Sequence, residues 1–136
     1  MRILGLDYGD ARTGVAISDL LGITAQGIES IKHGDNPKVL ISRLKEIINE
    51  YKPEKIVIGY PLNMNATKGP RAEKTDKFIK KLEQEFKIEV IKRDERLTTV
   101  ASHKTMTTLG ISKDKKKNIV DTISAQYILQ MYLDRA

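Results

Sequence analysis

Three acidic residues occupy positions where a carboxylate is unexpected: Asp7, Glu95 and Asp121. Asp7 directly follows the apolar residues 3–6, a segment expected to be a buried strand. A carboxylate beside an apolar core costs several kcal/mol unless it is paired, protonated or bound to a metal. Glu95 follows another apolar run, and helical spacing places Asp121 on the same face as the apolar Ile128. All three acids are therefore candidates for chemistry.

Convergence of the three side chains would create repulsion that raises the pKa of at least one carboxyl group. Mg²⁺ or Mn²⁺ would remove that repulsion, because hard divalent cations prefer carboxylate oxygens and retain waters and substrate phosphates as further ligands. Two such ions about 4 Å apart hold the attacking and leaving oxygens of an in-line phosphoryl displacement. The residue types therefore suit metal-assisted hydrolysis of a phosphodiester.

Each acid also has a simpler explanation. Asp7 fits a buried acid that caps a turn. Glu95 fits an ion pair with Arg93 or Arg96, and Asp121 fits an N-cap or first-turn acid that the helix dipole stabilises. The spacing alone leaves both kinds of explanation open.

Five short segments have the pattern of β-strands and must position these acids. Residues 3–6 and 15–17 are apolar runs joined through a Gly-rich polar segment, which is typical of a β-hairpin. Residues 27–32 alternate like a third strand, so the first three strands fit an antiparallel meander. Residues 55–59 and 88–92 each follow a helical segment, which favours buried parallel strands.

Helical patterns alternate with the later strands. Asn36 and Pro37 are expected to begin a helix that ends before Pro53, and residues 72–86 carry an apolar face of helical period. Two further helices are expected at about residues 100–109 and 118–134. The order predicts a single domain, residues 1–136, of the α/β class. Its mixed five-stranded sheet has three antiparallel strands, then two parallel ones, with helices on both faces.

The composition limits the class of protein. Hydrophobic residues make up 40% of the 136 positions and charged residues 31%, which is typical of a globular domain. No apolar run approaches the ~20 residues that span a bilayer, and no signal-peptide pattern is present. The absence of cysteine excludes disulfides, thiolate metal sites and a Cys nucleophile. We therefore expect a cytoplasmic protein without a membrane partner, and monomer and homodimer both remain open.

The net charge of +6 is unevenly distributed along the chain. Residues 1–70 contribute +1 and residues 71–136 contribute +5, an asymmetry that suits a nucleic acid partner. The densest basic segment is an expected loop at residues 113–117. Its lysines would contact backbone phosphates without reading the base sequence: Lys113, Lys115, Lys116 and Lys117. A solvated basic loop without a ligand is the alternative.

Four blocks occur in order along the chain before Asp121: GLDYG (5–9), RTGVAISD (12–19), GYPLNM (59–64) and DERLTT (94–99). Together they resemble the YqgF/RuvX family of ribonuclease H-like proteins, described as Holliday junction resolvases and as nucleases that mature the 5′ end of pre-16S rRNA. The resemblance covers essentially the whole chain and implies a ribonuclease H-like fold. It also implies that the acidic triad of the family corresponds to Asp7, Glu95 and Asp121.

Other residues in or beside these blocks are candidates for nucleic acid contacts. Arg12 fits a phosphate contact or, equally, an ion pair with Asp10 or Asp19. Asn63 fits a phosphate contact or an Asx-turn within its own loop, and Arg71 lies near a helix start that attracts anions. A second expected helix start supplies the remaining candidates, among which Thr99 also fits a plain cap: Arg96, Thr98 and Thr99.

The expected function is a metal-dependent nuclease. Asp7 would bridge two Mg²⁺ or Mn²⁺ ions, Glu95 and Asp121 would complete their ligand sets, and an activated water would attack the phosphodiester. Precursor 16S rRNA is the expected substrate, with branched DNA such as a Holliday junction as the alternative. Two other classes are an ATP-binding actin-like phosphotransferase lobe, for which the chain supplies only one lobe, and a non-catalytic nucleic acid binder.

Overall fold

The computed structural model describes residues 1–61, 65, 67–94 and 113–135, with the backbone alone for residues 113–118. Its strands form one sheet of order β3-β2-β1-β4-β5. In chain order the elements are β1 (Ile3–Tyr8), β2 (Arg12–Ser18), β3 (Ala25–Lys32), α1 (Pro37–Tyr51), β4 (Lys55–Tyr60), α2 (Pro70–Phe86), β5 (Glu89–Asp94) and α4 (Lys113–Leu133). The first three strands are antiparallel and the last two extend the sheet in parallel with β1, which confirms the predicted mixed sheet.

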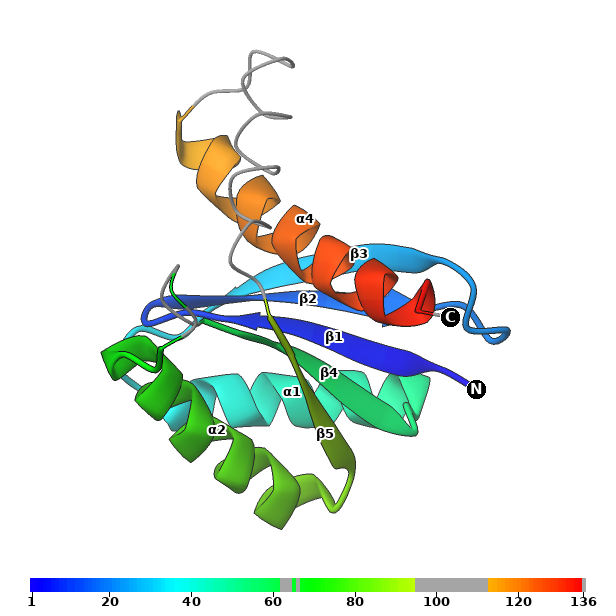
Figure 1. Cartoon of the computed structure of the whole chain (residues 1–136), viewed down its shortest axis with the longest axis horizontal. Coiled ribbons are helices and arrows are strands. Elements are labelled where there is room, and N and C mark those ends of the chain that lie inside the picture. The colour runs from blue at the N-terminus through cyan, green and yellow to red at the C-terminus, as the bar shows by residue number, and fades with distance from the viewer. Residues whose placement is uncertain (62–64, 66, 95–112, 136) are drawn as a thin grey trace.

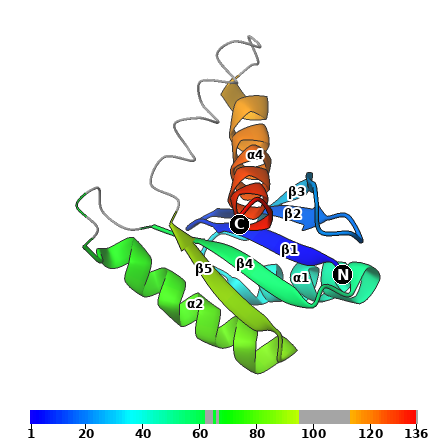
Figure 2. The same ribbon diagram turned by 45° about the vertical axis from the view of Figure 1, so that its right-hand side comes forward.

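Helices cover both faces of the sheet, as the sequence predicts. Of the described helices, α1 and α2 lie on one face, and α4 lies on the other, across β1, β2 and β3 (Figures 1 and 2). Within the described segments, no helix is long and apolar enough to cross a membrane. Because helices pack on both faces of the sheet, the carboxyl end of the central strand β1 lies in a sheet that is packed on both sides.

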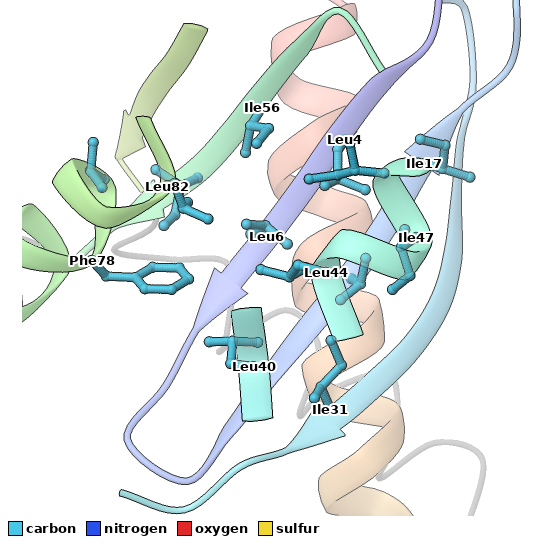
Figure 3. Close-up of a cluster of buried hydrophobic side chains, with 14 of the residues drawn as sticks. Leu4, Leu6, Ile17, Ile31, Leu40, Leu44, Ile47, Ile56, Phe78 and Leu82 are labelled. Carbon is cyan, nitrogen blue, oxygen red and sulfur yellow. The ribbon is translucent and has the colours of Figure 1, made fainter. Parts of the chain in front are cut away.

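The larger core lies between the sheet and helices α1 and α2 (Figure 3). Side chains alternate along β1, so Leu4 and Leu6 point into this core, where both are fully buried. Tyr8 continues the same face, and its ring stacks on Phe78 of α2 with 4.2 Å between ring centroids. The residues next to Asp7 in the chain are thus held in place by the core on the opposite face.

The second core, beneath α4, is built from smaller residues on the sheet side. The sheet side is supplied by Ile3, Ala16, Ala25 and Val57, and the helix side by Ala125, Ile128, Leu129 and Tyr132. Small residues in a sheet allow the helix backbone to approach closely, because no long side chains separate the two layers. This close approach decides where Asp121 lies.

The predicted beginning of α1 is confirmed. The Asn36 side chain accepts a hydrogen bond from the backbone N–H of Lys38 at 3.1 Å, and Pro37 is the first helical residue. Helix α2 also has proline at its first position, Pro70, but its cap residue Gly69 offers no side-chain acceptor. Its predicted apolar face is buried at Ala72, Thr75, Phe78, Ile79 and Leu82.

The start of the last helix differs from the prediction. Helix α4 begins at Lys113, five residues before the expected start at Asn118, so residues 113–117 are helical rather than a loop. Lysine is a good helix former, and this run contains neither glycine nor proline, so local propensity favours extension of the helix. The helix expected at residues 100–109 lies outside the described residues.

Candidate active site

Three residues on neighbouring strands form a row beneath α4. Asp7 of β1 pairs with Gly14 of β2, and Gly14 pairs with Ser30 of β3. Directly paired residues point to the same face of a sheet, and a Cβ on Gly14 would point at α4. Gly5, two residues before Asp7, also faces α4, because its Cβ would lie 2.7 Å from the Leu129 side chain. Asp7, Gly14 and Ser30 therefore share the face that α4 covers.

Glycine at position 14 allows the backbone of Asp121 to lie directly on β2. A Cβ added to Gly14 would lie 1.9 Å from the carbonyl oxygen of Asp121, far closer than any real contact. Asp7 and Ser30 flank this point from the two sides, on the strands next to β2. The sequence placed Asp121 on the packing face of its helix, and the structure confirms this, with the side chain 21% exposed.

The Asp121 carboxylate is held by two side chains from the sheet. Arg12 Nε lies 3.1 Å from Oδ2, and the Ser30 hydroxyl donates to the same oxygen at 2.9 Å. Among the described residues, none forms a hydrogen bond or ion pair with Oδ1. Burial raises the pKa of Asp121, and the Ser30 hydrogen bond and the Arg12 charge act in the opposite direction without cancelling it. A further cation near Asp121 would therefore stabilise its ionised form.

The donor types fit a hard divalent cation. Asp7 and Asp121 offer carboxylate oxygens, the ligands that Mg²⁺ and Mn²⁺ prefer, on the same face of the sheet. Within the part of the chain that the structure describes, no cluster of three or more His, Cys, Asp or Glu side chains is gathered closely enough to hold a metal. The third predicted ligand, Glu95, lies outside the described residues. The two described acids thus suit a metal but do not complete a site for it.

The partner of Arg12 is neither of the two acids that the sequence suggested. Arg12 pairs with Asp121, 109 positions away in the chain. Asp10 instead pairs with Lys74 of α2 at 3.3 Å, and the Asp19 carboxylate accepts from backbone N–H groups in the β2–β3 turn. The Arg12 guanidinium is 25% exposed, so it is accessible to a ligand at this edge.

Of the other predicted contact residues, the structure describes one with its side chain, four by their backbone alone and the rest not at all. Arg71 is exposed in the first turn of α2. Four candidates lie on the backbone of α4, and their side chains are not described: Lys113, Lys115, Lys116 and Lys117. The remaining candidates lie outside the described residues: Asn63, Arg96, Thr98 and Thr99.

A polar cluster on the α2 face ties the ends of β4 and β5 together, and sequence reasoning missed it. Asp76 of α2 accepts from the Tyr60 hydroxyl at 2.9 Å and contacts Lys92 at 2.9 Å and Lys68 at 3.3 Å. Lys92 also lies over the Tyr60 ring, 4.7 Å from its centroid. The cluster holds the end of β5, from which the chain continues to Glu95. In the sequence, only the helical spacing of Asp76 relative to its buried neighbours could have indicated this cluster, and that signal is weak.

Ser30 is the second residue that sequence reasoning missed. Its position in an alternating strand was predicted, but nothing in the local pattern identifies Asp121, 91 positions away, as its partner. The imidazole of His33 is buried and contacts the Thr13 hydroxyl through Nε2 at 3.0 Å. That arrangement is consistent with a structural histidine.

The chain is similar to known proteins over almost its entire length. A family model described as "RuvX: Holliday junction resolvase" matches residues 1–135. A protein of Ruminiclostridium cellulolyticum named "Putative pre-16S rRNA nuclease" is 63% identical over 135 residues, which cover 99% of this chain and 95% of the relative. A protein of the same name from Acetivibrio thermocellus is 54% identical, with 98% of this chain and 96% of the relative covered.

Solved structures show the same fold at low identity. RuvC of Thermus thermophilus superimposes with a TM-score of 0.60 at 12% identity, covering 98% of this chain and 94% of that protein. The fowlpox virus Holliday junction resolvase gives a TM-score of 0.56 at 18% identity, covering 98% of this chain and 99% of that protein. At these identities the likeness concerns the fold, which is the ribonuclease H-like fold that the family resemblance implies.

Proposed function

The chain belongs to the RuvX family, and we propose that it is a metal-dependent nuclease that hydrolyses phosphodiester bonds in nucleic acid. The observation that carries this proposal is the position of Asp121. Helix α4 lies so close to β2 that this half-buried carboxylate shares a face of the sheet with Asp7. Two carboxylates on one face of the sheet can bind a divalent cation, and a bound divalent cation promotes hydrolysis of a phosphodiester.

Asp7, Glu95 and Asp121 are the proposed catalytic residues and metal ligands. When bound, Mg²⁺ or Mn²⁺ would supply positive charge to the phosphate and lower the pKa of water. Asp7 would contribute its carboxylate from the central strand and Asp121 would contribute its carboxylate from α4. Glu95 follows Asp94, the last residue of β5, which is paired with Tyr60 of β4 in the sheet.

Precursor 16S rRNA is the proposed substrate, cleaved to mature its 5′ end in the cytoplasm. The support is the shared name of relatives that are 63% and 54% identical over nearly the full chain. A four-way DNA junction is the second candidate, because the matching family model is described as a Holliday junction resolvase. A structure of Thermus thermophilus RuvC with a Holliday junction substrate also superimposes, with a TM-score of 0.52 at 11% identity.

Basic residues around the acids would bind the phosphate backbone. Arg12 lies at the same edge as Asp121 and remains partly exposed, and Arg71 lies in the first turn of α2. The Lys-rich first turns of α4 continue the same helix that carries Asp121, so contacts there would lie along one element with the site. The same role is proposed for Asn63, Arg96, Thr98 and Thr99.

The deciding experiment is a cleavage panel with the full-length purified chain. The substrates are a 5′-extended 16S rRNA fragment, a single-stranded RNA and a four-way DNA junction, each with Mg²⁺ or Mn²⁺ and with EDTA. We expect metal-dependent cleavage of the rRNA precursor near the mature 5′ end and none in EDTA. Cleavage of the junction but not the precursor would replace the first substrate with the second.

Asp7→Asn with Asp10→Asn as a matched control tests the catalytic assignment. Both changes remove one carboxylate from the same hairpin, but the Asp10 carboxylate is exposed and pairs with the exposed Lys74 of α2. We expect Asp7→Asn to reduce cleavage to background and Asp10→Asn to retain it. Cleavage that survives Asp7→Asn would refute the proposed catalytic role of Asp7.

A further inference from the structure

We infer that Ser30 is a positioning residue for the Asp121 carboxylate, an inference that rests on the proposed metal-dependent function. Ser30 belongs to the edge strand β3, outside the sequence blocks that identify the family, and carries no charge. Its hydroxyl donates to Asp121 Oδ2 at 2.9 Å. This is a contact between the sheet and the covering helix at the one acid of α4 proposed to bind a metal.

The row of paired residues explains why serine can reach the carboxylate. Ser30, Gly14 and Asp7 are aligned across three neighbouring strands, so Ser30 and Asp7 lie about 10 Å apart, on either side of the point where α4 meets β2. Because Gly14 has no side chain, the space above it is occupied by the Asp121 backbone. The Asp121 side chain is thus within reach of the strand on the far side from Asp7.

Both sheet contacts of this carboxylate involve the same oxygen. Arg12 Nε and Ser30 Oγ both contact Oδ2, at 3.1 and 2.9 Å. No described residue contacts Oδ1 by a hydrogen bond or ion pair. A carboxylate held through one oxygen has its rotation about χ2 restricted, and the other oxygen stays available to a cation.

Ser30 and Arg12 make different kinds of interaction with the Asp121 carboxylate. The Arg12 guanidinium supplies positive charge, which a bound cation would partly replace, and it is a proposed phosphate ligand as well. The Ser30 hydroxyl is neutral, so it does not repel a cation and can keep its hydrogen bond when the cation binds. Hydrogen-bond partners of ligating carboxylates orient them, and their loss costs about 10- to 100-fold in metal affinity or activity.

The test measures Mn²⁺ binding by calorimetry on EDTA-treated, full-length protein without nucleic acid. The variants are Ser30→Ala, which removes the hydroxyl, and Ser30→Thr, which retains it and is well tolerated in strands. Ser42→Ala is the matched control, because Ser42 is an exposed serine on α1, on the opposite face of the sheet. Melting temperatures of the metal-free proteins report any purely structural effect.

We expect Ser30→Ala to weaken Mn²⁺ binding by about 10-fold, and Ser30→Thr and Ser42→Ala to bind within about twofold of the wild type. Binding by Ser30→Ala within twofold of the wild type would overturn the inference and leave the proposed function intact. Equal weakening in Ser30→Ala and Ser30→Thr would also overturn it, because the hydroxyl would not be responsible. Absence of Mn²⁺ binding by the wild type would overturn the metal-dependent function and the inference together.

Discussion

Gly14 of β2 lies directly beneath the backbone of Asp121 of α4, so close that a Cβ on Gly14 would be 1.9 Å from the Asp121 carbonyl oxygen. The contact joins two layers of the fold at a candidate catalytic acid. Gly5 and Gly27 similarly face Leu129 and Thr122 of the same helix. Glycines on three neighbouring strands thus determine how deeply α4 is seated and where its acid lies.

The first prediction concerns Gly14→Ala. The added methyl group meets backbone atoms of α4, which cannot rotate away, so the helix must shift. We expect the free energy of unfolding to fall by about 3 kcal/mol, at the upper end of overpacking costs, with weakened Mn²⁺ binding because Asp121 moves. Urea denaturation and calorimetry measure the two effects.

Gly34→Ala is the control for Gly14→Ala. A Cβ there meets no atom within 4 Å, but Gly34 has a φ of 56°, so alanine carries only the backbone cost of about 1 kcal/mol. Equal destabilisation by the two changes would contradict the proposed role of close helix approach.

The second prediction separates two roles of Arg12. If this residue contacts phosphate as well as Asp121, Arg12→Gln will weaken nucleic acid binding. It will also reduce the slope of log Kd against log salt by about 1, the contribution of one phosphate contact. Fluorescence anisotropy across a salt series measures both. Arg43→Gln is the control, since Arg43 is a paired arginine of α1 that contacts Glu29 and Glu46. An unchanged slope for Arg12→Gln would limit Arg12 to its ion pair with Asp121.

The third prediction concerns the pH dependence of the Asp76 cluster. Burial tends to raise the pKa of Asp76, but hydrogen bonds from Lys92, Tyr60 and Lys68 together outweigh it, so the pKa lies below its usual value of 3.8. A pKa lowered by folding means that Asp76 stabilises the protein above pH 3.8 and that this contribution is lost as the pH falls through the lowered value.

We therefore expect Asp76→Asn to cost about 1 kcal/mol at pH 7, because the ion pairs are partly exposed. The difference from the wild type should disappear as the pH falls below 3.8 towards the lowered pKa. Melting temperatures recorded between neutral and acidic pH test this. Glu89→Gln is the control at the other end of β5, where the contact with Lys55 is 3.8 Å long and exposed. A difference for Asp76→Asn that is independent of pH would show that charge is not the cause.

The fourth prediction concerns Gln130, which ties the end of α4 to the β2–β3 hairpin. Its side chain accepts from the backbone N–H of Ala25 at 2.8 Å and donates to the Ile23 carbonyl at 2.9 Å. Gln130→Ala leaves the N–H of the buried Ala25 without this partner, which should cost about 1–2 kcal/mol. Amide exchange at Ala25 should accelerate. Gln126→Ala, an exposed position one turn earlier, should leave that exchange unchanged.

Much of the fold follows from local patterns. Alternation and apolar runs predicted all five strands, because strand period depends on which faces are buried. The Asn36 cap and the proline after it determined where α1 begins, since capping depends on neighbouring residues alone. The helical spacing of Asp121 with Ile128 likewise predicted an acid on a packing face. The sequence blocks also indicated the family, which the matched family model confirms.

Only the tertiary structure decided the partners of that acid. The sequence offered Arg12 a phosphate contact or an ion pair with Asp10 or Asp19, which are close in sequence, but its ion pair is with Asp121 across two layers. Ser30 reaches the same oxygen because three strands align it with Gly14 and Asp7. Such contacts depend on strand register and on how closely a helix crosses a sheet. Both are properties of residues distant in the chain, which no local pattern encodes.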